Sequence, residues 1–347
     1  MYMKFRTWLS IITFVLLAVV IIAAWGDIRE AFGYLGKVDL WILALIIPVQ
    51  FISYFATGEM IFSYLRAKGN IRDLNVLKVT RMSLELNFVN HVFPSGGAAG
   101  IAYFSWLLGR HGVSSGRATM AQIIRFALTF ASFVLLLLVA LVILIIDHSV
   151  DRVTILLSLL LVVAAVGGMF GAIFLLGSKK RLDRFSMWLT RTVNKVVNWL
   201  TRGRKKKPLK EVTLATFFQD IHEDYLAIQR EKKILFKPFL WALLANILDV
   251  VLIYIAFWSF GVQINPALIF IAFGLASIAG AVVVTPGGAG VYEVVMVAFL
   301  TSAGVEATTA IAGTLLARVV LMLLTIVFGY FFYQMTLVKY GKSPAQR

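Results

Sequence analysis

Two arginines, Arg125 and Arg318, lie inside long apolar stretches of this 347-residue chain. A charged side chain at the centre of a bilayer costs about 2.5–3.5 kcal/mol on insertion scales, so it needs a partner or a function. A guanidinium group presents a planar set of donors that matches the oxygens of a phosphate. We therefore expect each arginine either to bind the phosphate of a lipid or to hold carbonyl groups that a nearby helix break leaves free.

Each arginine follows a break that contains proline and glycine. The first break contains Pro94, Gly96 and Gly97, and the second contains Pro286, Gly287 and Gly288. Arg125 follows Pro94 by 31 positions, and Arg318 follows Pro286 by 32. Proline lacks a backbone donor and glycine lowers helix propensity, so a helix cannot run cleanly through either break. The freed N–H groups suit an anion, although glycines also allow close packing between helices.

Acids accompany these breaks, but the two breaks are not equivalent. Glu293 lies seven positions after Pro286, where it can recognise a cationic head-group, carry a coupling proton or pair with Arg318. The matching positions of the first half are Ile101 and Ala102, so this acid is not duplicated. The other candidate binding residues near the breaks or inside apolar stretches are Glu85, Asn87, Asn90, Asp249 and Tyr292.

Composition places the whole chain in a membrane. Hydrophobic residues make up 60% of it, charged residues 14%, and the mean hydropathy is +0.88. These values are typical of an integral membrane protein. Cysteine is absent, which excludes disulfides and thiol catalysis, and the four histidines are scattered. We expect no metal site and no cofactor.

Hydropathy predicts six full crossings. They are Trp8–Trp25, Leu40–Leu65, Ala118–Ile146, Val153–Leu176, Pro238–Phe260 and Thr309–Met335. The first is 18 residues long and is interpreted as a retained helix rather than a signal peptide. A polar loop is predicted over Gly26–Asp39. The second crossing carries a polar stripe that we expect to face protein: Gln50, Ser53, Tyr54, Thr57 and Glu59.

The first segment that contains a break, Ser83–Leu108, is too short for two crossings, and the second, Ile264–Leu300, holds a similar break. Charge supports their interpretation as re-entrant hairpins. With both termini in the cytoplasm, the external loops hold only three of the 33 Lys and Arg residues: Arg29, Lys37 and Arg152. This distribution follows the positive-inside rule and accounts for the net charge of +16 without nucleic-acid binding.

Order and orientation of these segments predict an inverted repeat. The expected fold is an all-α polytopic membrane protein with six full transmembrane helices and two oppositely oriented re-entrant hairpins. Residues 1–347 form a single membrane domain, with a first repeat at 8–146 and a second at 153–335. A basic insertion at 177–237 is expected in the cytoplasm, where an amphipathic helix would meet anionic lipid head-groups. The sequence leaves the oligomeric state open, a homo-oligomer included.

The stretch from Asn87 to Gly97, the stretch from Thr285 to Glu293, and Arg318 together resemble the lysylphosphatidylglycerol synthase transmembrane-region family. The resemblance extends over about Trp8 to Met335. It implies a membrane half that acts as a lipid flippase, because aminoacyl transfer in this family belongs to a separate C-terminal cytoplasmic domain. The chain ends at Arg347, and a stand-alone flippase-like protein is the expectation.

The leading hypothesis is therefore a translocator of an anionic or aminoacylated phospholipid, or of a lipid-linked substrate, across a bacterial-type inner membrane. The protein would be multi-pass in the plasma membrane, with both termini cytoplasmic. One alternative is a lipid-modifying transferase like phosphatidylglycerol lysyltransferase, with Asp249 and Glu293 as its reactive pair. A second alternative is a small-solute secondary transporter, which shares the architecture.

Overall fold

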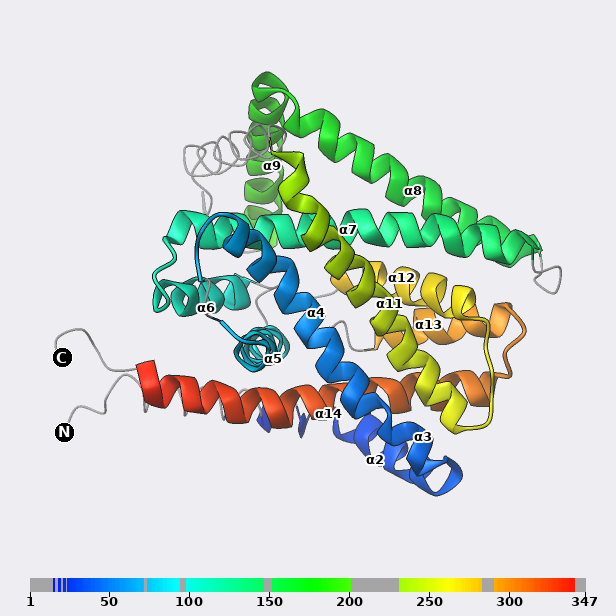
Figure 1. Ribbon diagram of the computed structural model, residues 1–347. Helices are drawn as coiled ribbons and strands as arrows, with labels where there is room; N and C mark the ends of the chain where they lie inside the picture. Colours follow the sequence, from blue (N-terminus) through cyan, green and yellow to red (C-terminus); the bar gives the residue numbers. More distant parts are fainter. Residues whose placement is uncertain are drawn as a thin grey trace. The chain divides into compact units, whose positions relative to one another are not determined.

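Helices form all the regular secondary structure in the described part of the computed structural model (Figure 1). The described residues are 15, 18–19, 21–22, 24–71, 74–93, 98–146, 152–200, 231–282 and 290–340. The elements are α2 (Trp25–Tyr34), η1 (Leu35–Lys37), α3 (Leu40–Ala44), α4 (Ile46–Ala67), α5 (Val76–Val92), α6 (Ala98–Gly109), α7 (Ser115–Ile146), α8 (Arg152–Leu176), α9 (Lys179–Leu200), η2 (Lys232–Leu235), α11 (Phe236–Ser259), α12 (Pro266–Val282), α13 (Val291–Ser302) and α14 (Ala307–Tyr340).

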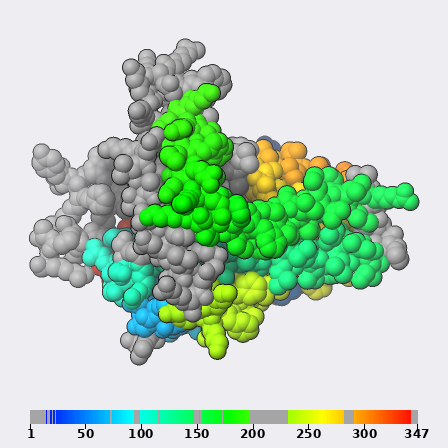
Figure 2. Space-filling view, turned by 90° about the horizontal axis from the view of Figure 1, so that it is seen from above, coloured from blue at the N-terminus to red at the C-terminus, as the bar shows by residue number. Residues whose placement is uncertain are grey.

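Within the described residues, five helical stretches are long and apolar enough to cross a bilayer, and the chain is a multi-pass membrane protein. The stretches are Leu40–Ala67, Arg117–Ile146, Thr154–Leu176, Lys232–Ser259 and Ala307–Tyr340. Between 18% and 44% of each apolar window is buried inside the protein, so most of each window faces outward. Part of the outward side of α7 is visible in Figure 2. Such an apolar surface is suited to lipid rather than to water.

These stretches coincide with the predicted crossings from Leu40 onwards, whereas most of the predicted crossing Trp8–Trp25 lies outside the described residues. The polar loop predicted over Gly26–Asp39 is wrong, because α2 covers Trp25–Tyr34. Ile28 and Ala31 are one helical turn apart and pack on Val319 of α14. This apolar stripe favours a helix although the rest of the segment is polar.

Short helices flank both predicted breaks, while residues 94–97 and 283–289 themselves lie outside the described part. The helices after the breaks, α6 and α13, have 12 residues each. At 1.5 Å per residue each spans about 18 Å, well short of a hydrocarbon core of about 30 Å. In Figure 1, α12 and α13 run side by side, whereas α5 is seen end-on and crosses α6 steeply.

Helix α14 packs against α2, α4, α5 and α13, and so it contacts helices from both breaks. Phe88 of α5 and Tyr333 of α14 belong to one buried apolar cluster. Gly329 allows this approach, because a Cβ atom there would overlap the Phe88 side chain. The position of α14 relative to the first break is therefore fixed by close packing.

The chain divides into two compact units. Residues Met1–Val162 and Lys237–Arg347 form the first, which contains every candidate site residue, and Val163–Phe236 form the second. Helix α9 of the second unit matches the predicted amphipathic helix: Leu182 is buried, whereas Arg184, Trp188 and Arg191 are exposed. The helix predicted over Glu211–Lys233 lies mostly outside the described residues.

Candidate functional site

Arg318 and Glu293 form an ion pair next to the second break. Arg318 Nε lies 2.6 Å from Glu293 Oε1, and the two side chains are 21% and 12% exposed. The Arg318 guanidinium also lies over the ring of Tyr292, with 4.6 Å between Cζ and the ring centroid. Glu293 Oε2 accepts a hydrogen bond of 2.7 Å from the Gly290 N–H, which caps α13. The carboxylate therefore both balances an arginine and fixes the start of a helix.

Further titratable groups surround this pair, and we call the set Asp27, His91, Asp249, Tyr292, Glu293 and Arg318 the Arg318 cluster. Arg318 interacts electrostatically with His91 and Tyr292, and Asp249 interacts with Tyr292. Burial raises the pKa of Asp27 in α2; Glu293 adds to the rise and Arg318 opposes it. Because His91 precedes the first break and Glu293 follows the second, the cluster joins residues from both breaks.

The polar stripe of α4 faces protein, as its sequence suggests. Ser53 Oγ donates to Asp249 Oδ1 over 3.2 Å. Gln50 Nε2 donates to the Tyr54 hydroxyl over 2.7 Å and to Thr325 Oγ1 over 3.2 Å. These bonds connect α4 with α11 and α14, and they hold Asp249 at the edge of the Arg318 cluster.

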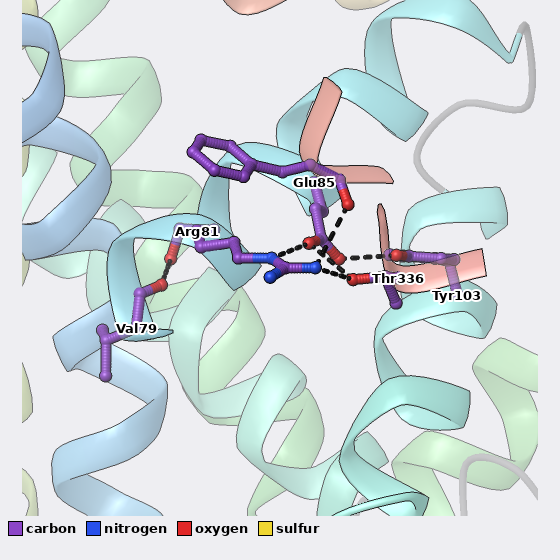
Figure 3. Close-up of polar contacts among 7 residues, drawn as sticks. Val79, Arg81, Glu85, Tyr103 and Thr336 are labelled. Carbon is purple, nitrogen blue, oxygen red and sulfur yellow. Dashed lines mark hydrogen bonds and ion pairs between the residues drawn. The ribbon is translucent and has the colours of Figure 1, made fainter. Parts of the chain in front are cut away.

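Glu85 occupies a separate junction with Arg81, Tyr103 and Thr336 (Figure 3). Arg81 Nε donates to Glu85 Oε1 over 2.8 Å, and the Tyr103 hydroxyl donates to Oε2 over 2.7 Å. Thr336 Oγ1 lies 2.8 Å from Oε1 and accepts from Arg81 Nη2 over 2.7 Å. The Glu85 side chain is fully buried, so protein donors satisfy both its oxygens. Glu85 thus ties α5 and α6 to α14 instead of being open to a ligand.

Arg125 lies in a different environment from Arg318. Its guanidinium rests on the ring of Phe126, with 4.3 Å between Cζ and the ring centroid. Its Nε is buried without a hydrogen-bond partner, and no ion pair joins Arg125 to another described residue. One turn earlier on α7, Gln122 Nε2 donates to the Ile101 carbonyl over 3.0 Å, and Gln122 Oε1 is buried without a partner among the residues that the structure describes. The start of α6 therefore contacts Gln122 of α7, whose Oε1 has no partner among the described residues.

The two asparagines before the first break differ from each other. Asn87 Nδ2 donates to the Ser83 carbonyl of its own helix over 2.9 Å, so the backbone accounts for it. The Asn90 amide packs directly on Gly100, and Asn90 Oδ1 is buried without a partner among the described residues. Other candidates lie outside the described residues: Pro94, Gly96, Gly97, Pro286, Gly287 and Gly288.

Arg125 and Arg318 have different surroundings, although each follows its break at nearly the same distance in the sequence. Glu293 compensates the charge of Arg318, whereas no described carboxylate pairs with Arg125. An uncompensated guanidinium in a membrane helix is unfavourable and is well suited to receive a phosphate. Sequence reasoning did not select Asp27 or Gln122. The spacing of one helical turn between Gln122 and Arg125 can be read from the sequence. Asp27, in contrast, reaches its cluster only through the packing of α2 on α14.

Comparison with known proteins shows that residues 8–329, which include the site described above, match a known membrane-protein family. The family model of the lysylphosphatidylglycerol synthase TM region matches residues 8–329. A UPF0104 membrane protein of Methanothermobacter thermautotrophicus is 23% identical over 307 residues, which are 88% of this chain and 87% of that protein. The match to the family model includes both breaks, Arg125 and the Arg318 cluster.

Proposed function

The chain belongs to the lysylphosphatidylglycerol synthase TM region family, and we propose that it translocates an anionic or aminoacylated phospholipid whose phosphate Arg125 binds. The observation that carries this proposal is that no described carboxylate pairs with Arg125, which lies within the apolar helix α7. A lipid phosphate supplies the missing negative charge while its acyl chains stay in the bilayer. The resulting charge-assisted hydrogen bonds are stronger than neutral ones.

The proposed route for the head-group runs between two re-entrant hairpins that are related as an inverted repeat. Support comes from the short helices on either side of each break and from the arginine that follows each break. In this arrangement one repeat rocks against the other and opens the site to each side in turn. The Arg318 cluster contains residues from both proposed hairpins, so such a movement would change its contacts.

We place the protein in the plasma membrane with both termini in the cytoplasm, because basic residues are concentrated in the segments assigned to that side. The exposed basic residues of α9 would then attract anionic lipids. The chain has no cysteine, so single cysteines can test this topology. A membrane-impermeant maleimide should label Gly36→Cys in intact cells and Ser114→Cys only after permeabilisation. Labelling of Ser114→Cys in intact cells contradicts the orientation.

A proteoliposome assay tests the proposed transport. The protein is reconstituted with a fluorescent phospholipid, and a membrane-impermeant quencher measures how fast the inner-leaflet label becomes accessible. Wild type should accelerate this exchange over empty liposomes, and Arg125→Gln should slow it at least tenfold. Arg152→Gln, at the exposed start of α8, is the matched control and should transport as wild type does. Equal rates for Arg125→Gln and wild type contradict the assignment of Arg125.

The transferase alternative requires a reactive pair formed by Asp249 and Glu293. Ser53 donates to Asp249, while Gly290 and Arg318 engage Glu293, and these contacts favour a structural role for both acids. We therefore propose that the chain does not itself transfer aminoacyl groups. Incorporation of a labelled aminoacyl group into lipid by the purified protein would contradict this. Exchange of a small anion without exchange of lipid would favour solute transport instead.

A further inference from the structure

One helical turn before Arg125, the side-chain oxygen Oε1 of Gln122 is buried and has no described hydrogen-bond donor. From it we infer that Gln122 is a specificity-determining residue, whose Oε1 accepts a hydrogen bond from the group esterified to the lipid phosphate. The preferred substrate is then a phosphate diester that carries a hydroxyl or ammonium donor. This inference rests on the proposed function and assigns a role to a residue that the phosphate-binding step does not require.

The orientation of the Gln122 amide is fixed by its one hydrogen-bond partner in the described part of the chain, the Ile101 carbonyl. The Ile101 carbonyl can only accept a hydrogen bond, so the side-chain NH₂ must point to it, as the 3.0 Å contact shows. The atom left without a partner is therefore the acceptor Oε1. Gln122 is 1% exposed, so neither water nor a head-group reaches this oxygen in the conformation described, and the proposed rocking of one repeat against the other has to open it to the substrate. A buried acceptor without a donor is destabilising, by about 1–3 kcal/mol.

Helical geometry places this acceptor next to the proposed phosphate ligand. Gln122 and Arg125 are three positions apart on α7, a spacing that puts two side chains on the same face. Helix α6 packs against α7, and Gln122 contacts Ile101 in the first turns of α6. The Asn90 amide packs on the adjacent Gly100 and also has a buried oxygen without a partner. The neutral acceptors of Gln122 and Asn90 thus lie near the start of α6, and Arg125 follows Gln122 by one helical turn on α7.

Arg125 as a donor and Gln122 Oε1 as an acceptor would together distinguish between phospholipids of equal charge. A phosphate diester is ionised at neutral pH and has acceptors but no donor, so it satisfies Arg125 and leaves Gln122 unsatisfied. A glycerol or sugar hydroxyl, or an ammonium group, supplies the donor that Oε1 needs. Because the acceptor is a neutral amide rather than a carboxylate, an uncharged hydroxyl is sufficient. A site built to bond such a group discriminates against the analogue that lacks it.

Two lipids that differ in this donor test the inference. Fluorescent phosphatidylglycerol and phosphatidylmethanol carry the same charge, but only the former has free hydroxyl groups on its head-group. In the proteoliposome assay, wild type should transport phosphatidylglycerol about three- to tenfold faster, as expected for one hydrogen bond. Gln122→Met keeps the length of the side chain and removes the acceptor, and it should bring the ratio of the two rates close to one. Arg152→Gln should keep the wild-type ratio.

The outcomes separate this inference from the proposed function. If wild type transports both lipids at the same rate, or if Gln122→Met slows both and keeps their ratio, Gln122 does not read the head-group. If wild type transports neither lipid, the proposed function itself fails. A purely structural role for the bond to Ile101 would lower both rates together, and thermal unfolding of Gln122→Met measures that contribution separately. The wild-type comparison needs no variant and so does not depend on folding.

Discussion

Neutralising one partner of the Glu293–Arg318 pair should destabilise the protein by about 2 kcal/mol. Glu293→Gln removes the charge but keeps an oxygen that can accept from the Gly290 N–H, so it isolates the loss of the ion pair. Exposed pairs contribute about 0–1 kcal/mol, and breaking a buried pair costs about 3–5 kcal/mol. With side chains 21% and 12% exposed, this pair lies between those limits.

Arg318→Gln leaves Glu293 unbalanced and should have an effect of similar size. The double variant leaves no unpaired charge, so its loss should be smaller than the sum of the two single losses by about 1–2 kcal/mol. Denaturant unfolding of the four proteins in one detergent measures this coupling. Glu306→Gln, an exposed acid at the start of α14, serves as the control and should change stability by less than about 0.5 kcal/mol. The assigned pairing would be refuted if the losses of unfolding free energy of the two single variants add up to that of the double variant, or if each single variant is as stable as wild type.

Three further changes test the packing around the site. Glu85→Gln should cost about 2–4 kcal/mol, because Arg81, which is 27% exposed, loses its carboxylate partner at the junction of α5, α6 and α14; a melting temperature equal to wild type contradicts that junction. Gly329→Ala should cost about 1–3 kcal/mol through overlap with Phe88, whereas Gly36→Ala meets no neighbouring atom and should cost far less. Asp39→Ala should cost about 1 kcal/mol because two N–H groups of α3 lose their cap. Asp39→Asn keeps a side-chain oxygen that can accept from these groups, and it should retain most of the wild-type stability in the same unfolding assay.

The membrane helices from Leu40 onwards could be predicted because long apolar stretches leave little alternative in a bilayer. Their flanking segments could not be predicted equally well. Gly26–Asp39 carries several charges and is polar on average, yet Ile28 and Ala31 give α2 one apolar side that packs on α14. The sequence contains that spacing, but only the presence of α14 makes it decisive. The steep crossing of α5 and α6 likewise depends on packing rather than on local sequence.

For the site, charge within apolar segments predicted the key residues, and pairing with Arg318 was one of the roles expected for Glu293, but the partners of Glu85 and Asp249 could not be predicted. Charge in an apolar helix marked both Arg125 and Arg318 and gave them the same two expected roles, although Glu293 already distinguished the second break. The difference between them depends on packing, because α13 packs on α14 and brings Glu293 to Arg318, whereas no described carboxylate pairs with Arg125. The partners of Glu85 could not be predicted either, because its hydrogen bond with Thr336 joins residues 251 positions apart. The roles proposed for the glycines and prolines of the two breaks remain predictions.

Direct binding of lipid by Arg125 is the most immediate test of this account. Native mass spectrometry can count the phospholipid molecules that remain bound when the protein is released from detergent in the presence of phosphatidylglycerol. Wild type and Arg152→Gln should retain bound phosphatidylglycerol, and Arg125→Gln should lose most of it while keeping its native charge-state distribution. If Arg125→Gln retains as much phosphatidylglycerol as wild type, Arg125 is not the phosphate ligand and the proposed route for the head-group is wrong.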